Sequence, residues 1–255
     1  RLAVLGKELH EVLLPLRGGA IGRLWVDPLG TSLGRDVSFS PRTLIYLEGA
    51  LVDLIYQVID GAVMLYKLLP DGRRQVVEIL GAGDIFGFSP SLVHDCFAET
   101  LIGTRCTVFD RTQIERSPVL MRRLCSHLYV QVCNLHEHTV LLGRKTAIER
   151  MASFLMRCIP GRGIQNCPGS RRDDDSAQIH LAMTRLEIAD YLGLTIETVS
   201  RTLTKLKRRG VLSLSRLDEI RVHDVCRLCR LTGTPLTRGQ WCSSRVEALI
   251  KDPWT

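Results

Sequence analysis

Residues 183–203 read MTRLEIADYLGLTIETVSRTL and hold the strongest fold signal in the chain. Thr184, followed three residues later by Glu187, forms a capping-box pattern that predicts the start of a short helix. Gly193 permits the sharp turn that ends this helix, and Thr195 is a suitable N-cap for the next one. Two short helices joined by such a turn predict a helix-turn-helix, the motif whose second helix enters the major groove of DNA.

The second predicted helix exposes groups that can read base edges. Glu197, Ser200 and Arg201 lie at i, i+3 and i+4, hence on one face. A carboxylate can accept from cytosine N4, and a guanidinium can bond guanine O6 and N7, while serine lets the helix approach a thymine methyl. The alternative is an ion pair between Glu197 and Arg201 on a solvated helix. The surrounding motif favours base reading.

Positive charge follows the same helix. The formal net charge of the chain is +7. No acid lies between Glu197 and Asp218, whereas this interval holds six cations: Arg201, Lys205, Lys207, Arg208, Arg209 and Arg216. A local cation cluster favours a polyanion such as double-stranded DNA, although a solvated helix face has the same composition. We predict phosphate contacts for Thr184, Arg185, Thr195, Thr198, Lys205 and Arg208. Residues 210–215 and 219–222 are predicted strands of a wing.

The first half of the chain is strand-like. Glycine turns recur about every 11–12 residues at Gly49, Gly61, Gly72 and 81–83. The segments between them, at 55–59, 62–66 and 75–80, are rich in β-branched and aromatic residues. This spacing is typical of short antiparallel strands, so we predict a β-barrel or β-roll over about 20–110.

A long helix is predicted to follow Pro118, because the next glycine or proline is Gly143. Its apolar residues repeat every seven positions, a pattern that indicates a partner helix and therefore a homodimer. The predicted dimer residues are Met121, Leu124, Leu128, Leu135 and Leu142. The polar residues Gln131 and His138 fall on the second apolar position of the heptad and would make the interface imperfect. The alternative is that the helix packs on the roll of its own chain. A second helix is predicted at 147–156, followed by a polar loop at 160–176.

Composition excludes several classes of protein. Apolar residues make up 45% and charged residues 24%, as in ordinary globular chains. Apolar stretches are too short for a membrane span, and we identify no signal peptide. The nine irregularly spaced cysteines argue against a disulfide framework. We therefore expect a soluble, cytoplasmic chain with no membrane partner.

Cysteines and histidines do not form a convincing metal site. Cys226, Cys229 and Cys242 lack the second half of a zinc site, so we interpret them as core or surface thiols. His136, His138 and Cys133 point to different faces of the long helix. Residues 40–110 hold only His94, which disfavours a cupin-like metalloenzyme. We expect no metal and no cofactor.

The combination of roll, long helix and winged helix-turn-helix resembles the CRP/FNR superfamily of bacterial transcription regulators over about 40–230. The stretches that carry the resemblance are 83–87 (GDIFG), 141–150 (LLGRKTAIER) and above all 195–201 (TIETVSR). The middle stretch is most similar to the FixK-type subgroup, which controls microaerobic, nitrogen-fixation and respiratory genes.

The resemblance implies an α+β fold with an N-terminal double-stranded β-helix, a cyclic-nucleotide-binding-like roll. The implied domains are 1–117 (roll), 118–145 (dimerisation helix), 146–232 (winged helix-turn-helix) and 233–255 (tail). It implies a DNA-binding homodimer, an activator without catalytic activity that works with RNA polymerase. In the family the residues matching Glu197, Ser200 and Arg201 read a TTGA half-site, repeated as TCAA in a palindrome.

Two departures from relatives narrow the expected input signal. The stretch 95–98 (DCFA) holds no arginine where cyclic-AMP-binding relatives have a phosphate clamp. No cysteine precedes Cys96, whereas iron–sulfur relatives carry an N-terminal cysteine cluster; Cys106 matches only their roll cysteine. A regulator gated by a ligand, haem or nitric oxide through its roll remains the alternative.

Overall fold

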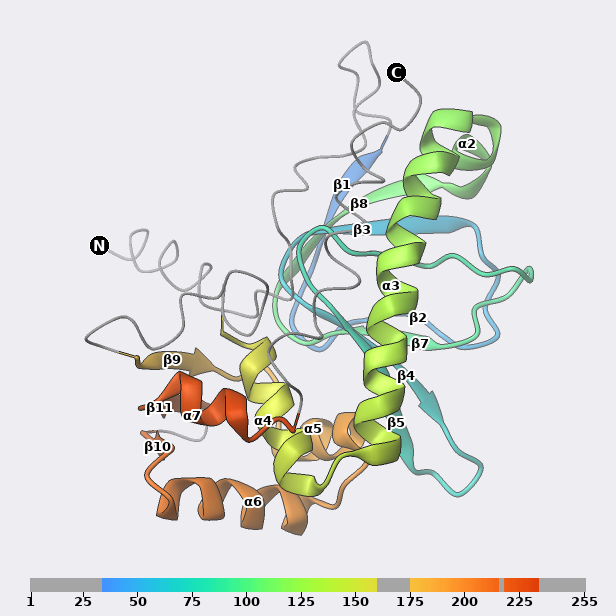
Figure 1. The fold of residues 1–255 in the computed structure, drawn as a ribbon. Coiled ribbons are helices and arrows are strands. Elements are labelled where there is room, and N and C mark those ends of the chain that lie inside the picture. The colour runs from blue at the N-terminus through green and yellow to red at the C-terminus, as the bar shows by residue number, and fades with distance from the viewer. Residues whose placement is uncertain (1–33, 160–174, 216–217, 234–255) are drawn as a thin grey trace. The chain divides into compact units, whose positions relative to one another are not determined.

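The computed structural model describes residues 34–159, 175–215 and 218–233 (Figure 1). They form two compact units, which meet in sequence between Gln131 and Val132. Among the described residues, no helix is both long enough and apolar enough to cross a membrane.

The first unit is an antiparallel β-roll, as predicted. One four-stranded sheet has the order β1-β8-β3-β6 and the other the order β2-β7-β4-β5. The strands are β1 (Arg35–Phe39), β2 (Leu44–Tyr46), β3 (Leu54–Asp60), β4 (Val63–Leu68), β5 (Arg74–Leu80), β6 (Ile85–Phe86), β7 (Phe97–Thr100) and β8 (Thr104–Asp110). The predicted strand segments 55–59 and 75–80 lie in β3 and β5, and the segment 62–66 lies in β4 except for Ala62.

The turn glycines behave as predicted. Gly49, Gly61, Gly72 and Gly83 have φ angles of 83°, 101°, 84° and 95°. Two reasons exclude a side chain at Gly61. Its φ is positive, and an added Cβ would lie only 2.5 Å from Thr104 Oγ1.

Two helices leave the roll, α2 (Arg111–Arg116) and the long α3 (Pro118–Arg144), which is green in Figure 1. The prediction of α3 is confirmed, whereas α2 was not predicted. In its first half, α3 packs on the roll: Leu120 and Leu124 are buried in a cluster with Ile55, Ile85 and Phe109.

This packing gives part of the predicted dimer stripe a contact within its own chain. Leu124 is buried in the cluster, and the partly buried Met121 and Leu128 pack against it, so these three residues contact the roll of the same chain. Gln131 is buried as well and donates from Nε2 to the Ile85 carbonyl at 2.8 Å. The alternative, a helix packed on its own roll, therefore holds for this half of α3.

A different face of α3 is exposed. Tyr129, Val132 and Val140 are 65%, 45% and 52% exposed. With exposed Cys125 and His136 they follow spacings of three and four residues, as a coiled-coil seam does. We call Cys125, Tyr129, Val132, His136 and Val140 the exposed stripe of α3. Leu135, 39% exposed, borders this stripe, while Leu142 is half-buried.

The second unit is a winged helix-turn-helix. Its elements are α4 (Ala147–Arg157), β9 (Ala177–His180), α5 (Arg185–Leu192), α6 (Ile196–Arg208), β10 (Leu212–Leu214), β11 (Glu219–Val222) and α7 (Val225–Arg230). The predicted wing strands are β10 and β11, and β9 pairs with β11 to complete a three-stranded sheet. Strand β9 and helix α7 were not predicted. The predicted loop at 160–176 lies almost wholly outside the described residues, and so does the tail beyond Gly233.

Candidate nucleic-acid interface

The helix that precedes the recognition helix is built as its capping box predicts. Thr184 Oγ1 accepts from the Glu187 N–H at 3.2 Å, and Glu187 Oε2 accepts from the Thr184 N–H at 2.7 Å. Helix α5 ends at Gly193, whose φ of 59° and ψ of 44° are left-handed. A residue with a Cβ would be strained in this conformation, so glycine makes the tight turn possible.

Helix α6 has one buried side and one exposed side. Thr195 caps it by accepting from the Thr198 N–H at 3.2 Å. Its buried residues recur at helical spacing and pack toward α5 and α4: Val199, Thr202, Leu203 and Leu206. The opposite side is left to solvent, as a groove-reading helix requires.

The three predicted base-reading residues share that exposed side. Glu197, Ser200 and Arg201 are all exposed. Arg201 donates from Nε to the Glu197 carbonyl at 3.4 Å and from Nη2 to Thr198 Oγ1 at 3.5 Å. These bonds are long, and they use two of the donors that a guanidinium offers, so the fork remains available to a base. Hydrogen bonds from its own backbone N–H and from Thr195 lower the pKa of Glu197, which is therefore an anion and a pure acceptor at neutral pH.

The predicted phosphate contacts are mostly accessible. Thr184, Thr195, Lys205 and Arg208 are exposed, and Thr198 is half-buried. Arg185 differs, because it is half-buried and burial lowers its pKa. Lys205 and Arg208 lie in the last turn of α6, where they also stabilise the negative end of the helix dipole.

The roll interior is filled with aromatic rings. Tyr56 stacks on Phe86 with ring centroids 5.0 Å apart, and Tyr46 lies 6.1 Å from each of them. Tyr46 also stacks on His94 at 3.6 Å. These side chains belong to or border the core of the roll.

The roll thiols are core groups. Cys106 lies within the buried cluster of the roll, and burial raises the pKa of its thiol to about 12. Burial likewise raises the pKa of Cys96 to about 12, with a smaller contribution from the Asp95 carboxylate. Both are protonated at neutral pH, whereas a metal-binding cysteine is a thiolate.

The remaining cysteines of interest lie on α7. Cys229 is buried and Cys226 half-buried, and Cys242 lies outside the described residues. Within 34–159, 175–215 and 218–233, no three His, Cys, Asp or Glu side chains are grouped in a way that could hold a metal ion.

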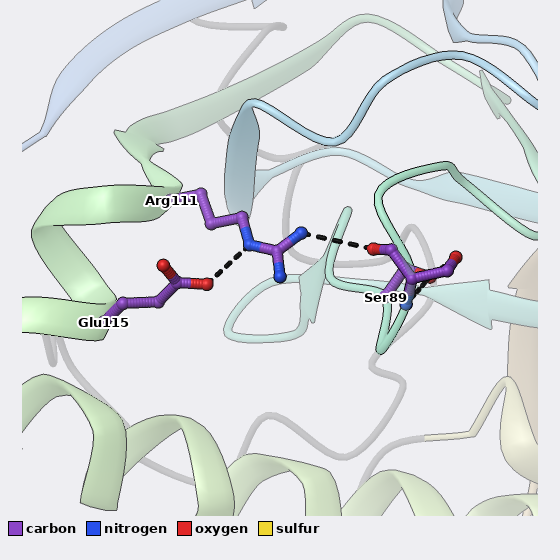
Figure 2. A network of polar contacts seen from close by, with 4 residues as sticks. Ser89, Arg111 and Glu115 are labelled. Atoms are coloured by element: carbon purple, nitrogen blue, oxygen red, sulfur yellow. Dashed lines mark hydrogen bonds and ion pairs between the residues drawn. The ribbon is translucent and has the colours of Figure 1, made fainter.

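A polar network that the sequence did not indicate fastens one loop of the roll to α2. Figure 2 shows Arg111 between Glu115 and the loop that carries Ser89. Its Nε pairs with Glu115 Oε1 at 2.6 Å, and its Nη1 donates to the Ser91 carbonyl at 3.2 Å. The hydroxyls of Ser89 and Ser91 are 2.9 Å apart. These contacts hold in place a loop whose Leu92 is 73% exposed.

Comparisons with known proteins agree with both units. Residues 36–116 match the cyclic nucleotide-binding domain family, and residues 149–231 match the Crp-like helix-turn-helix domain family.

Individual relatives are regulators. The chain is 42% identical over 178 residues to the nitrogen fixation regulation protein FixK of Rhizobium meliloti (strain 1021), covering 69% of this chain and 77% of that protein. It is 34% identical over 196 residues to the transcriptional activatory protein AadR of Rhodopseudomonas palustris, covering 75% of this chain and 79% of that protein. Among solved structures it resembles FixK2 from Bradyrhizobium japonicum, with a TM-score of 0.67, 34% identity, and coverage of 79% of this chain and 98% of that one. The chain therefore belongs to the CRP/FNR family of DNA-binding transcription regulators, among its FixK-type members.

Proposed function

We propose that the chain acts as a homodimeric activator that binds a palindromic operator of the TTGA/TCAA type. The observation that carries the proposal is the joint exposure of Glu197, Ser200 and Arg201 on one side of a capped α6. The nitrogen-fixation regulator and the activator among its relatives support a role in microaerobic, respiratory or nitrogen-fixation genes. The proposed site of action is the cytoplasm, where the DNA is.

The proposed domains follow one another along the chain. We propose 118–145 as the dimerisation helix and 146–232 as the DNA-binding domain, with 1–117 assigned to the roll domain and 233–255 to the tail from the sequence alone. The aromatic packing inside the roll favours a scaffold over an effector-gated roll.

Base reading is tested by comparing two cations of α6. In a direct titration of labelled DNA, Arg201→Ala should weaken binding to the intact palindrome by about 1–3 kcal/mol and lose the preference for guanine in the half-site. Lys205→Ala, the control, should weaken intact and guanine-substituted operators alike and make binding less dependent on salt. An Arg201→Ala protein that still prefers the guanine would refute the assignment.

The homodimer is proposed to form along the exposed stripe of α3. Tyr129, Val132 and Val140 give this stripe an apolar surface with coiled-coil spacing. Leu135 lies at its edge. A two-fold axis along α3 would place two recognition helices in successive major grooves, about 34 Å apart.

RNA polymerase is the proposed protein partner, and an apolar patch on the roll is its proposed contact. Leu51 and Leu92 are 67% and 73% exposed, and the two segments pair through a bridge between Leu51 and Val93. Arg111 holds the second segment in place, which reduces the entropy lost when a partner binds. Exposed apolar groups on an ordered surface are typical of protein contacts.

The patch is tested by transcription rather than by DNA binding. Leu92→Ser should leave operator affinity unchanged and lower transcript yield several-fold in a reaction with purified RNA polymerase and an operator-bearing promoter. Leu44→Ser, at another exposed leucine of the roll (44% exposed), is the control and should keep full yield. Equal yields from wild type and Leu92→Ser would exclude this contact.

A further inference from the structure

We propose that Arg150 of α4 is a positioning residue for operator binding, because its guanidinium fastens the C-terminal ends of α3 and α5 together. Nη2 donates to the Leu142 carbonyl at 2.6 Å, and Nε donates to the Lys145 carbonyl at 2.9 Å. Nη1 donates to the carbonyls of Leu192 and Gly193 at 2.8 and 3.2 Å. One side chain thus bonds the ends of two helices.

Helix ends need such a partner. The last four carbonyls of a helix have no intrahelical donor, and they carry the negative end of the helix dipole. Leu142 belongs to the last turn of α3 and Leu192 is the last residue of α5. A guanidinium offers a planar fork of donors with a permanent charge and can serve both ends at once, whereas the ammonium of lysine donates from one point.

The close approach of the Arg150 guanidinium to the end of α5 depends on Gly193. An added Cβ there would lie 3.2 Å from Leu142 Cδ2 and 3.3 Å from Arg150 Nη1. Glycine at this turn therefore serves the close approach of Arg150 and Leu142 as well as the left-handed backbone.

A second set of contacts joins the same three helices, α3, α4 and α5. His138 of α3 stacks on Tyr191 of α5 with ring centroids 4.4 Å apart and an interplanar angle of 21°. Arg157 of α4 donates from Nη1 to the Tyr191 hydroxyl at 2.5 Å. His138 is only 6% exposed, so the stack is part of the interior of this unit. Helix α5 is thus held to α3 and α4 at two places near its C-terminus.

The consequence for DNA binding rests on the proposed function. Helix α6 begins three residues after Gly193 and packs on α5, so a fixed α5 sets the direction of α6 relative to α3. If the dimer axis runs along α3, this direction determines how far apart the two recognition helices lie. Arg150 would then determine which half-site spacing the dimer accepts.

The test measures spacing preference in the full-length dimer. Arg150→Met removes the fork with a side chain of similar length, and Arg144→Met, at an exposed arginine two residues before α4's N-cap, is the matched control. Binding is measured to the palindrome with its preferred spacer, to versions with one base pair added or removed, and to a single half-site. Arg150→Met should bind the palindrome with the preferred spacer about tenfold more weakly than the wild type does, and its affinity for the single half-site should fall far less. Its affinities for the different spacers should therefore become nearly equal. Arg144→Met should keep the wild-type preference.

Two further variants separate positioning from simple loss of folding. Arg150→Lys keeps the charge but not the fork, so it should resemble Arg150→Met. Gly193→Ala retains Arg150 but places a methyl group close to its Nη1, so this variant should also weaken the preference for one spacer length. If Arg150→Met does not fold, Gly193→Ala is used in its place. Equal losses on every DNA, or a wild-type preference in Arg150→Lys, would overturn the proposal. If the wild type itself prefers no palindrome over a half-site, the homodimer proposal fails instead.

Discussion

At the scale of single residues, His138 is the clearest case of a group whose environment sets its chemistry. Burial, with smaller contributions from the Arg157 and Arg150 cations, lowers the pKa of His138 to about 4. Its ordinary value is 6.5, so between about pH 6.5 and 4 the unfolded chain binds a proton that the folded chain does not. The stability of the second unit should therefore fall as the pH falls through this window.

Replacement of His138 by phenylalanine tests this linkage. The variant keeps an aromatic ring against Tyr191 but cannot titrate. Between pH 7.5 and pH 5.0, the wild type should lose about 2 kcal/mol more unfolding free energy than His138→Phe. Urea unfolding at the two pH values measures the difference. Parallel losses in the two proteins would show that His138 is not the titrating group.

At the scale of elements, helices α6 and α3 contrast. In α6 the apolar residues occupy one side, so the sequence alone separates the buried side from the exposed recognition side. In α3, apolar residues lie around much of the circumference, and both the heptad of leucines and the exposed stripe have helical spacing. Packing on the roll uses the stripe that contains Leu124 and leaves the other exposed.

Two leucines of α3 test this assignment. Leu124→Ala should destabilise the folded roll by about 2–5 kcal/mol, because it opens a cavity among buried side chains. Leu135→Ala, at an exposed position of the same helix, should cost less than about 1 kcal/mol at low protein concentration. Both values come from denaturant unfolding followed by tyrosine fluorescence. A larger cost for Leu135→Ala would mean that the Leu135 side chain, and not only the residues around Leu124, is buried in the folded chain.

At the scale of the whole molecule, the proposed dimer rests on the exposed stripe of α3. Val132→Glu places a charge in the middle of the stripe and should convert the dimer to monomers at micromolar concentration, as measured by sedimentation velocity. Operator affinity should fall with it, because each monomer engages only one half-site.

The control for this prediction is the same substitution elsewhere on α3. Val119 is 37% exposed and lies in the first turn, off the stripe, where a glutamate also suits the helix dipole. Val119→Glu should remain a dimer. Dissociation by both variants, or by neither, would place the dimer contact on another surface.

The local features of this protein follow from its sequence, because the interactions that form them span only a few residues. The caps at Thr184 and Thr195, the turn at Gly193, the hairpin glycines and the two-sided pattern of α6 all belong to this class. They were sufficient to predict the roll, the winged helix-turn-helix and the three residues proposed to read bases.

The tertiary structure decided what depends on contacts between distant segments. It showed that Leu124 is buried against the roll and that Met121 and Leu128 pack beside it, because apolar spacing predicts that a side chain is buried but not which element covers it. It also brought Arg150 to the Leu142 and Leu192 carbonyls, a contact that no spacing predicts, because the ends of α3 and α5 are 50 residues apart in the chain and become neighbours only when the helices pack.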